Sequence, residues 1–342
     1  MAAAPSRDRS GAVRADRTPS RRLGPAVVAG ALALGLVLAY AVVCAVVADA
    51  LTRPVRRAPD RLPSDYGLGY ESVVFPSRGD AIPLAGWLIA PLRPGADPGN
   101  EGSARRPVVL VHGRGGDRQH ELDGRFLEIA AALAGDGHPV MAFDLRGYGG
   151  SGGTRYTMGA HEVRDAAGAV DFLDRHGLAP DGVDVVGYSM GAATGLLFAA
   201  GDPRVRVVAA DSAYADLEEV LPAQVPRLSG LPRWFTPGTL VMTRALTGVD
   251  ATRLRPVDAV PPLAARGARL LVVHGEADSW VPPSHGRRLA AAYGPGAEAL
   301  FVPGAEHVGS YAADPQAYLG RLLPFLARAA GTGRPGGPNT GP

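Results

Sequence analysis

The sequence predicts an α/β fold: a doubly wound, mostly parallel sheet of eight strands with a helical insertion, preceded by one apolar N-terminal helix. Short apolar runs alternate with amphipathic segments through most of the chain, an order typical of a parallel sheet covered by helices. Runs 107–111 and 269–273 are almost continuously apolar, as expected of strands that are buried on both faces. An uncharged run over residues 24–48 lies ahead of them.

The N-terminal segment differs in composition from the rest of the chain. Residues 1–23 are rich in Arg, Ser and Ala, so we expect a disordered basic N-terminus. Residues 24–50 follow as a candidate transmembrane helix or signal anchor, because about 20 apolar residues cross a hydrocarbon core about 30 Å thick. Ala48-Asp49-Ala50 resembles a small-residue cleavage site. A cleaved signal peptide and a buried core helix therefore stay open as alternatives.

Arginines on the two sides of this run indicate its orientation. Six precede it, whereas Arg53, Arg56, Arg57 and Arg61 follow it. Cytoplasmic loops carry an excess of Lys and Arg, so the balance favours a cytoplasmic N-terminus. We therefore expect a single-pass membrane protein with an extracytoplasmic folded domain.

Residues 51–69 are expected to form a Pro/Arg-rich linker, and residues 70–330 the folded domain. Its strands are expected at 70–75, 82–90, 107–111, 138–143, 183–187, 206–210, 269–273 and 298–302. Its helices are expected at 120–135, 159–176, 190–200, 284–293 and 314–329. Residues 213–262 break this alternation and are too long for a plain connection, so we expect a helical lid insertion. The Gly/Pro-rich tail, 331–342, is expected to be disordered.

Composition excludes several classes of function. The first 57 residues carry nine Arg and three Asp within a whole-chain charge of +2, so the folded part is mildly acidic and lacks the basic stripe of a nucleic-acid-binding domain. All basic residues are Arg, which excludes a catalytic lysine. The single cysteine, Cys44, lies in the apolar run without polar neighbours that would activate it. No metal-binding motif is visible, and nothing in the sequence calls for a cofactor.

The motif Gly187-Tyr188-Ser189-Met190-Gly191 carries the strongest chemical signal. It follows an apolar strand and opens an Ala-rich helix. A sharp strand-to-helix turn of this kind lifts the serine hydroxyl to the carboxyl edge of the sheet, where the helix N-terminus favours a developing negative charge. The context predicts that Ser189 is a nucleophile rather than an inert serine in a glycine-rich turn.

A serine nucleophile needs a base and a carboxylate that orients the base. His307 follows the last strand, and Asp278 follows the strand before it, so both are expected at the same sheet edge as Ser189. Asp211 is the alternative carboxylate. His112 and His274 each end an apolar strand in a His-Gly pair and are expected to be buried structural imidazoles.

Two backbone N–H groups should stabilise the oxyanion. Met190, directly after the nucleophile, is one candidate. Arg114, in the loop after strand 107–111, is the other. The glycine-rich segment 144–152 lacks the Lys-Ser/Thr end of a phosphate loop and is expected to pack beneath the site.

The insertion is apolar enough to line an acyl pocket. Trp234 and Phe235 from this insertion, together with Tyr188 of the turn, are the candidate substrate contacts. The alternative, that the apolar residues of the insertion only pack it onto the domain, is equally open.

The chain resembles the α/β-hydrolase superfamily over residues 70–330. The resemblance rests on motifs in their usual order: His112-Gly113, 144–149 (Asp-Leu-Arg-Gly-Tyr-Gly), the serine turn, His274-Gly275-x-x-Asp278 and His307. The membrane-anchored branch with domains similar to prolyl oligopeptidase and serine aminopeptidase fits best. The resemblance implies catalytic roles for Ser189, Asp278 and His307, and oxyanion roles for Met190 and Arg114. Serine at this position disfavours the dehalogenase and epoxide-hydrolase branches, which carry Asp there.

The sequence therefore predicts two-step acyl transfer through an acyl-enzyme on a small-molecule ester or other acyl compound. Carboxylic esters are the leading substrate class, while peptidase, amidase and thioesterase activities remain alternatives because one fold hosts them all. A non-catalytic, membrane-tethered binding protein is a further alternative. The sequence does not indicate an oligomeric state.

Overall fold

The computed structural model describes residues 24–92, 96–97, 100–101 and 105–330 of the 342-residue chain. The expectations of disorder at 1–23 and 331–342 lie outside the described residues.

An eight-stranded sheet forms the centre of the domain, with strand order β1-β2-β6-β5-β7-β8-β9-β10. Only the pairs that involve β2 are antiparallel, so the predicted mostly parallel sheet is confirmed. The strands are β1 (Tyr70–Pro76), β2 (Pro83–Ile89), β5 (Val108–Val111), β6 (Val140–Phe143), β7 (Val183–Tyr188), β8 (Val205–Asp211), β9 (Arg269–Gly275) and β10 (Glu298–Val302). β3 (Ala96–Asp97) and β4 (Asn100–Glu101) pair as a separate antiparallel two-stranded sheet.

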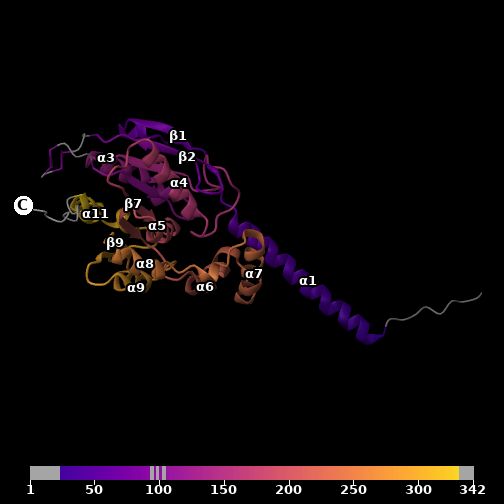
Figure 1. The fold of residues 1–342 in the computed structure, drawn as a ribbon. Helices are drawn as coiled ribbons and strands as arrows, with labels where there is room; N and C mark the ends of the chain where they lie inside the picture. The colour runs from indigo at the N-terminus through magenta and orange to yellow at the C-terminus, as the bar shows by residue number, and fades with distance from the viewer. Residues whose placement is uncertain (1–23, 93–95, 98–99, 102–104, 331–342) are drawn as a thin grey trace, which may run out of the picture.

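Helices cover both faces of the sheet (Figure 1). Val109 and Val111 of β5 point into one core with the helices α4 (Glu162–Arg175), α5 (Met190–Gly201), α8 (Pro256–Ala265) and α9 (Pro283–Tyr293). Val108 and Leu110 point into the other core with α3 (Phe126–Gly135) and α11 (Pro315–Ala330). Alternate side chains of a strand face opposite sides, which explains why this run is apolar at every position.

One predicted helix, 120–135, is divided in the structure. A short helix, α2 (Glu121–Gly124), precedes α3, because Leu122 and Asp123 adopt positive φ values of 56° and 54°. Another short helix, α10 (Ser310–Ala313), precedes α11.

Between β8 and β9 the chain forms α6 (Leu217–Ser229), the 3-10 turn η2 (Arg233–Phe235), α7 (Thr236–Thr247), the 3-10 turn η3 (Ala251–Arg253) and α8. Val260 and Leu263 pack α8 into the core, whereas α6 and α7 extend to the side of the sheet (Figure 1). We call residues 217–247 the lid segment.

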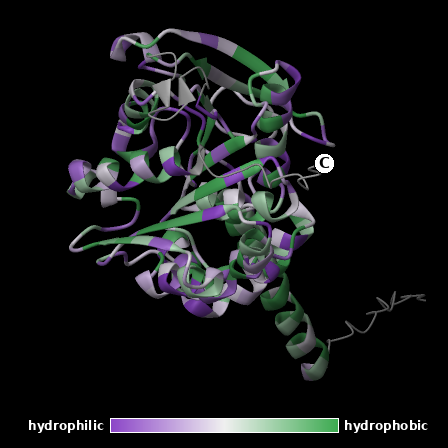
Figure 2. Cartoon of the chain, turned by 60° about the vertical axis from the view of Figure 1, so that its left-hand side comes forward, coloured by the Kyte–Doolittle hydropathy of each residue, from purple (hydrophilic) through white to green (hydrophobic). Residues whose placement is uncertain are grey.

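The N-terminal helix α1 (Pro25–Thr52) projects from the domain with α7 beside the end nearest the sheet (Figure 1). Its exposed part is apolar along its length (Figure 2). The helix is long and apolar enough to cross a membrane, although a signal sequence near an N-terminus has the same features.

The chain stays attached to the domain after α1 ends. Arg56 donates hydrogen bonds to the carbonyl oxygens of Ser151 and Gly153, both at 2.6 Å. Arg57 donates to the carbonyl of Gly115 at 3.1 Å. A short 3-10 helix, η1 (Pro63–Tyr66), then leads into β1.

Candidate active site

Ser189 stands at the turn between β7 and α5, with φ 51° and ψ −115°. The turn is tight, because a Cβ at Gly191 would lie 2.5 Å from the carbonyl oxygen of His112 and closer still to that of Val111. A Cβ at Gly187 would lie 2.5 Å from the carbonyl oxygen of Gly191. Only glycine fits at these two positions, and the close approach of the backbones is what raises the serine above the sheet edge.

Ser189, His307 and Asp278 form one hydrogen-bonded row. His307 Nε2 lies 2.8 Å from Ser189 Oγ, and His307 Nδ1 lies 2.7 Å from Asp278 Oδ2. In the tautomer that is protonated at Nδ1, the imidazole donates to the carboxylate and accepts from the serine hydroxyl. The structure therefore brings together three loops that follow β7, β9 and β10, as the sequence led us to expect.

Asp278 is buried and fully hydrogen-bonded. Its Oδ1 accepts from the backbone N–H groups of Trp280 and Val281, both at 2.8 Å. Burial alone would raise the pKa of this carboxyl, but hydrogen bonds from His274 and His307 outweigh burial and hold the pKa well below its usual range. Asp278 is therefore an ionised carboxylate that faces the imidazole.

Asp211, the alternative carboxylate, accepts a hydrogen bond from Ser212 Oγ at 2.9 Å. Burial raises its pKa to about 6. No hydrogen bond joins it to His307 in the described part of the chain, so the geometry favours Asp278 as the partner.

The two candidate oxyanion donors lie near the serine. Met190 is the first residue of α5, where backbone N–H groups have no acceptor within the helix. Arg114 lines the same cavity as Ser189. The neighbouring N–H of Gly113 is already engaged, because it donates to Glu121 Oε2 at 2.7 Å.

Glu121 is a buried acid that sequence reasoning missed. Its carboxyl group lies directly beneath the loop that carries Gly113 and Arg114, so close to Gly116 that a Cβ there would overlap it. Burial raises the pKa of Glu121 to about 8, against the lowering effect of the Gly113 hydrogen bond. Glu121 lies at the start of the helix expected at 120–135, and nothing in the sequence around it indicates that its carboxyl group points inward.

His112 and His274 are fully buried. His112 Nδ1 lies 2.8 Å from the Gly113 carbonyl, and its Nε2 accepts from the N–H of Leu145 at 3.0 Å. His274 Nε2 lies 2.8 Å from the carbonyl of Val281 and 3.3 Å from Asp278 Oδ2. Both imidazoles therefore fix loops that carry candidate site residues.

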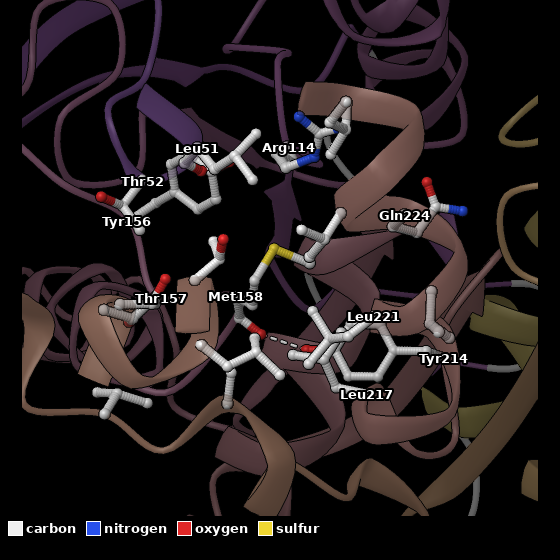
Figure 3. Close-up of a pocket in the computed structure, with 18 of the residues that line it drawn as sticks. Leu51, Thr52, Arg114, Tyr156, Thr157, Met158, Tyr214, Leu217, Leu221 and Gln224 are labelled. Carbon is white, nitrogen blue, oxygen red and sulfur yellow. Dashed lines mark hydrogen bonds between the residues drawn. The ribbon is translucent and has the colours of Figure 1, made fainter. Parts of the chain in front are cut away.

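A cavity of about 310 Å³ opens beside Ser189 and His307. Figure 3 shows Met158 near its centre, with Leu217 and Leu221 of α6 on one side and Leu51 and Thr52 of α1 on the other. Side chains of α7, including Leu240, complete the wall. The lining is mainly apolar. The sequence did not indicate that residues of α1 would be part of it.

The three residues predicted to contact the substrate, Tyr188, Trp234 and Phe235, are not among the residues that line this cavity. Tyr188 points away from it: its ring is buried against Phe126, and its hydroxyl lies 3.2 Å from that of Tyr318. Side chains of a strand alternate between faces, so the residue before Ser189 turns into the opposite core.

Trp234 and Phe235 stack on each other and on Tyr40 of α1. The stacked rings therefore hold the lid segment against the N-terminal helix.

Among the residues that the structure describes, no group of three or more His, Cys, Asp or Glu side chains is arranged to hold a metal ion.

A family model described as "Alpha/beta hydrolase family" matches residues 108–321. The chain is 28% identical over 256 residues to the uncharacterized Mycobacterium tuberculosis protein Rv2307c, covering 75% of this chain and 79% of that protein. It is 24% identical over 244 residues to the uncharacterized protein YfhR of Escherichia coli K12, covering 70% of this chain and 74% of that protein.

Solved structures share the fold. The Pyrococcus furiosus esterase Pf2001 matches with a TM-score of 0.66 at 22% identity, covering 81% of this chain and 98% of that one. Est1E of Butyrivibrio proteoclasticus, solved with bound ferulic acid, matches with a TM-score of 0.57 at 17% identity, covering 76% of this chain and 100% of that one. At these identities the likeness concerns the fold alone.

Proposed function

Because the chain belongs to the alpha/beta hydrolase family, we propose that it is a serine hydrolase that cleaves carboxylic esters through an acyl-enzyme. The observation that carries the proposal is the hydrogen-bonded row from Ser189 Oγ through His307 to Asp278. A nucleophile within 2.8 Å of its base, with the base oriented by a buried carboxylate, is the arrangement that activates a serine hydroxyl.

In the first half of the reaction, Ser189 Oγ attacks the ester carbonyl carbon while His307 Nε2 takes the hydroxyl proton. Asp278 stabilises the resulting imidazolium, and the N–H groups of Met190 and Arg114 donate to the oxyanion. When the intermediate collapses, the C–O bond to the alcohol breaks and His307 returns the proton to the leaving oxygen. In the second half, water attacks the acyl-Ser189 ester with His307 again as base, and the free acid is released.

An ester is favoured over a peptide by the cavity beside the serine. Its lining offers apolar side chains such as Leu217, Leu221 and Leu240, which suit an acyl chain better than a polar peptide backbone. Two of the proteins that share the fold are themselves described as an esterase and as a ferulic-acid-bound Est1E.

The proposal includes α1 as an uncleaved, single-pass membrane anchor with the catalytic domain on the extracytoplasmic side. The Arg excess ahead of α1 supports this orientation. Residues 213–262, which contain the lid segment, are proposed to act as a lid over the cavity.

The test is covalent labelling of the detergent-solubilised full chain with a fluorophosphonate, together with hydrolysis of p-nitrophenyl butyrate. Wild type should be labelled and active, and Ser189→Ala should lose both properties. Ser279→Ala, which alters an exposed serine on the Asp278 loop, is the matched control and should keep both. Equal labelling of Ser189→Ala and wild type would remove the proposal. If the protein cleaved amides or thioesters but no oxygen ester, the serine mechanism would stand and carboxylic esters would be rejected as its substrates.

A further inference from the structure

The end of α1 forms part of the wall of the candidate active site. Leu51 and Thr52 line the cavity that contains Ser189. Tyr156, another lining residue, fixes them: its hydroxyl donates to the Leu51 carbonyl, and its N–H donates to the Thr52 carbonyl at 3.0 Å. Arg155 pairs with Asp49 and donates to Thr52 Oγ1 at 2.6 Å. The N-terminal helix is thus built into the cavity as well as attached to the domain.

Helix α7 contributes to the wall of the cavity and also packs directly on α1. A Cβ at Gly238 would lie 2.6 Å from Cys44 Sγ and from the Tyr40 hydroxyl, so the two helices are in backbone-to-side-chain contact. The Tyr40 hydroxyl donates to the carbonyl of Trp234 at 3.0 Å. Since α7 also contributes Leu240 to the cavity, the cavity lies in the angle between α1 and the lid segment.

The length of α1 sets the distance between the cavity and the hydrocarbon core of a membrane. A hydrocarbon core about 30 Å thick takes up about 20 residues at roughly 1.5 Å per residue. Counted from Pro25, the core ends near Cys44, so Tyr40, Trp234 and Phe235 fall at the boundary where aromatic side chains gather. Leu51 then lies roughly 10 Å further on, at the level of the lipid headgroups.

The lid segment exposes apolar side chains beside this boundary. Trp234 is 61% exposed and Val241 62% exposed, and Leu228 and Leu246 are exposed as well. Outside α1, the large hydrophobic side chains that are exposed among the described residues are Val55, Leu62, Val74, Leu92, Leu228, Trp234, Val241 and Leu246. Half of them therefore lie on the lid segment, beside the helix that is apolar enough to cross a membrane (Figures 1 and 2). Apolar surface gathered in this way marks a membrane contact.

We infer that the substrate is a membrane-resident fatty-acyl ester, whose chain passes from the bilayer along the exposed apolar side chains of the lid segment into the cavity and reaches Ser189 without crossing water. The inference rests on the proposed function and narrows its substrate class. A cavity of about 310 Å³ lies at the small end of ligand sites, which span roughly 300–1,000 Å³, and suits one narrow chain.

The experiment uses the full chain reconstituted in phosphatidylcholine vesicles, with two esters assayed on the same sample. One is 4-methylumbelliferyl palmitate, dissolved in the bilayer, and the other is water-soluble p-nitrophenyl butyrate. The double variant Val241→Glu/Leu246→Glu places charge on the lid surface outside the cavity lining. We expect the ratio of palmitate to butyrate turnover to fall at least tenfold. The matched control Val74→Glu, at a 70% exposed valine of β1, should leave that ratio unchanged.

An unchanged ratio in the double variant, or wild-type turnover of butyrate without turnover of palmitate, would overturn the inference and leave the proposed function intact. Absence of wild-type turnover of both esters would count against the proposed function itself. If the double variant loses both activities, Val241→Ser provides the same test without adding charge, and a ratio equal to that of wild type would then overturn the inference.

Discussion

At the scale of single residues, Ser189 is held at a positive φ of 51°. For a residue with a side chain such a conformation costs of order 1–3 kcal/mol, and the surrounding contacts of Gly187 and Gly191 enforce it. The local strain and the hydrogen bond to His307 together fix the hydroxyl in one place, which is the property that a nucleophile needs.

Replacing Asp278 by Asn should lower kcat for p-nitrophenyl butyrate by roughly 10³–10⁴-fold, because the amide favours the wrong imidazole tautomer. The hydrogen bond of 2.7 Å to His307 Nδ1 makes Asp278 the carboxylate to test. Asp211→Asn is the comparison, since Asp211 is the alternative carboxylate for His307, and we expect less than a tenfold change. Steady-state kinetics of the two variants would separate them. A larger loss in Asp211→Asn would reverse the assignment.

Glu121 should make the folded protein less stable as the pH rises toward 8. The folded state keeps this proton up to a pKa of about 8, whereas an unfolded chain releases it near pH 4. Between these values the folded state binds more protons, so the free energy of unfolding falls with rising pH, by at most about 1.4 kcal/mol per pH unit. Glu121→Gln cannot ionise and still offers an oxygen to the Gly113 N–H. It should therefore lose less stability than wild type between pH 6.5 and pH 8 (roughly the window set by this pKa).

Thermal unfolding at these two pH values checks this expectation. Glu218→Gln, which alters an exposed glutamate of α6, should keep the wild-type pH dependence. The same pH dependence in Glu121→Gln and wild type would show that Glu121 does not hold its proton in the folded state.

At the scale of elements, the sequence predicted the strands and the order of the motifs, because buried strands are apolar at every position and the glycines of the Ser189 turn stand at fixed spacing. The sequence could not predict which element the side chain of a single aromatic residue would contact. The sequence left open whether Trp234 and Phe235 contact the substrate or pack the insertion onto the domain, whereas in the structure both rings stack on a different partner. That partner is Tyr40, 194 residues before Trp234, and no local pattern encodes so distant a contact.

The contact between β5 and α5 should tolerate no side chain at Gly191. Gly191→Ala would press a Cβ against the carbonyl oxygens of Val111 and His112, and overpacking of backbone typically costs about 1–3 kcal/mol or more. We expect a lower thermal midpoint and loss of esterase activity. Gly201→Ala, in the same helix but with open space around it, should be neutral or stabilising by about 0.4–1 kcal/mol. Equal stability of the two variants would contradict the close approach of Gly191 to the carbonyl oxygens of Val111 and His112.

Packing of α1 on α7 should protect the thiol of Cys44, which is the only cysteine of the chain and is fully buried. Gly238→Val would push against Cys44 and Tyr40 and separate the helices. We expect N-ethylmaleimide to label Cys44 slowly in wild type in detergent and at least tenfold faster in Gly238→Val. Gly320→Val, at a helical glycine of α11 with open space, serves as the control. Fast labelling of native wild type would contradict the contact.

At the scale of the whole molecule, the question is whether α1 stays attached. The candidate cleavage sequence at 48–50 lies within the helix rather than in an exposed loop, and Ala48 is fully buried. Proteolysis concentrates at exposed, flexible sites, so we expect the chain to remain uncut. The intact mass of protein extracted from membranes should equal that of a chain that includes α1. A mass equal to that of a chain beginning at Leu51 would contradict this expectation.

The attachment of Arg56 and Arg57 to the carbonyls of Ser151, Gly153 and Gly115 has a kinetic consequence. If α1 anchors the chain as proposed, these bonds hold the catalytic domain at a fixed place beside the bilayer, and it meets bilayer-dissolved esters by lateral diffusion. Its velocity should then follow the mole fraction of ester among the lipids, and dilution with inert phospholipid should slow it even when the bulk ester concentration is held constant.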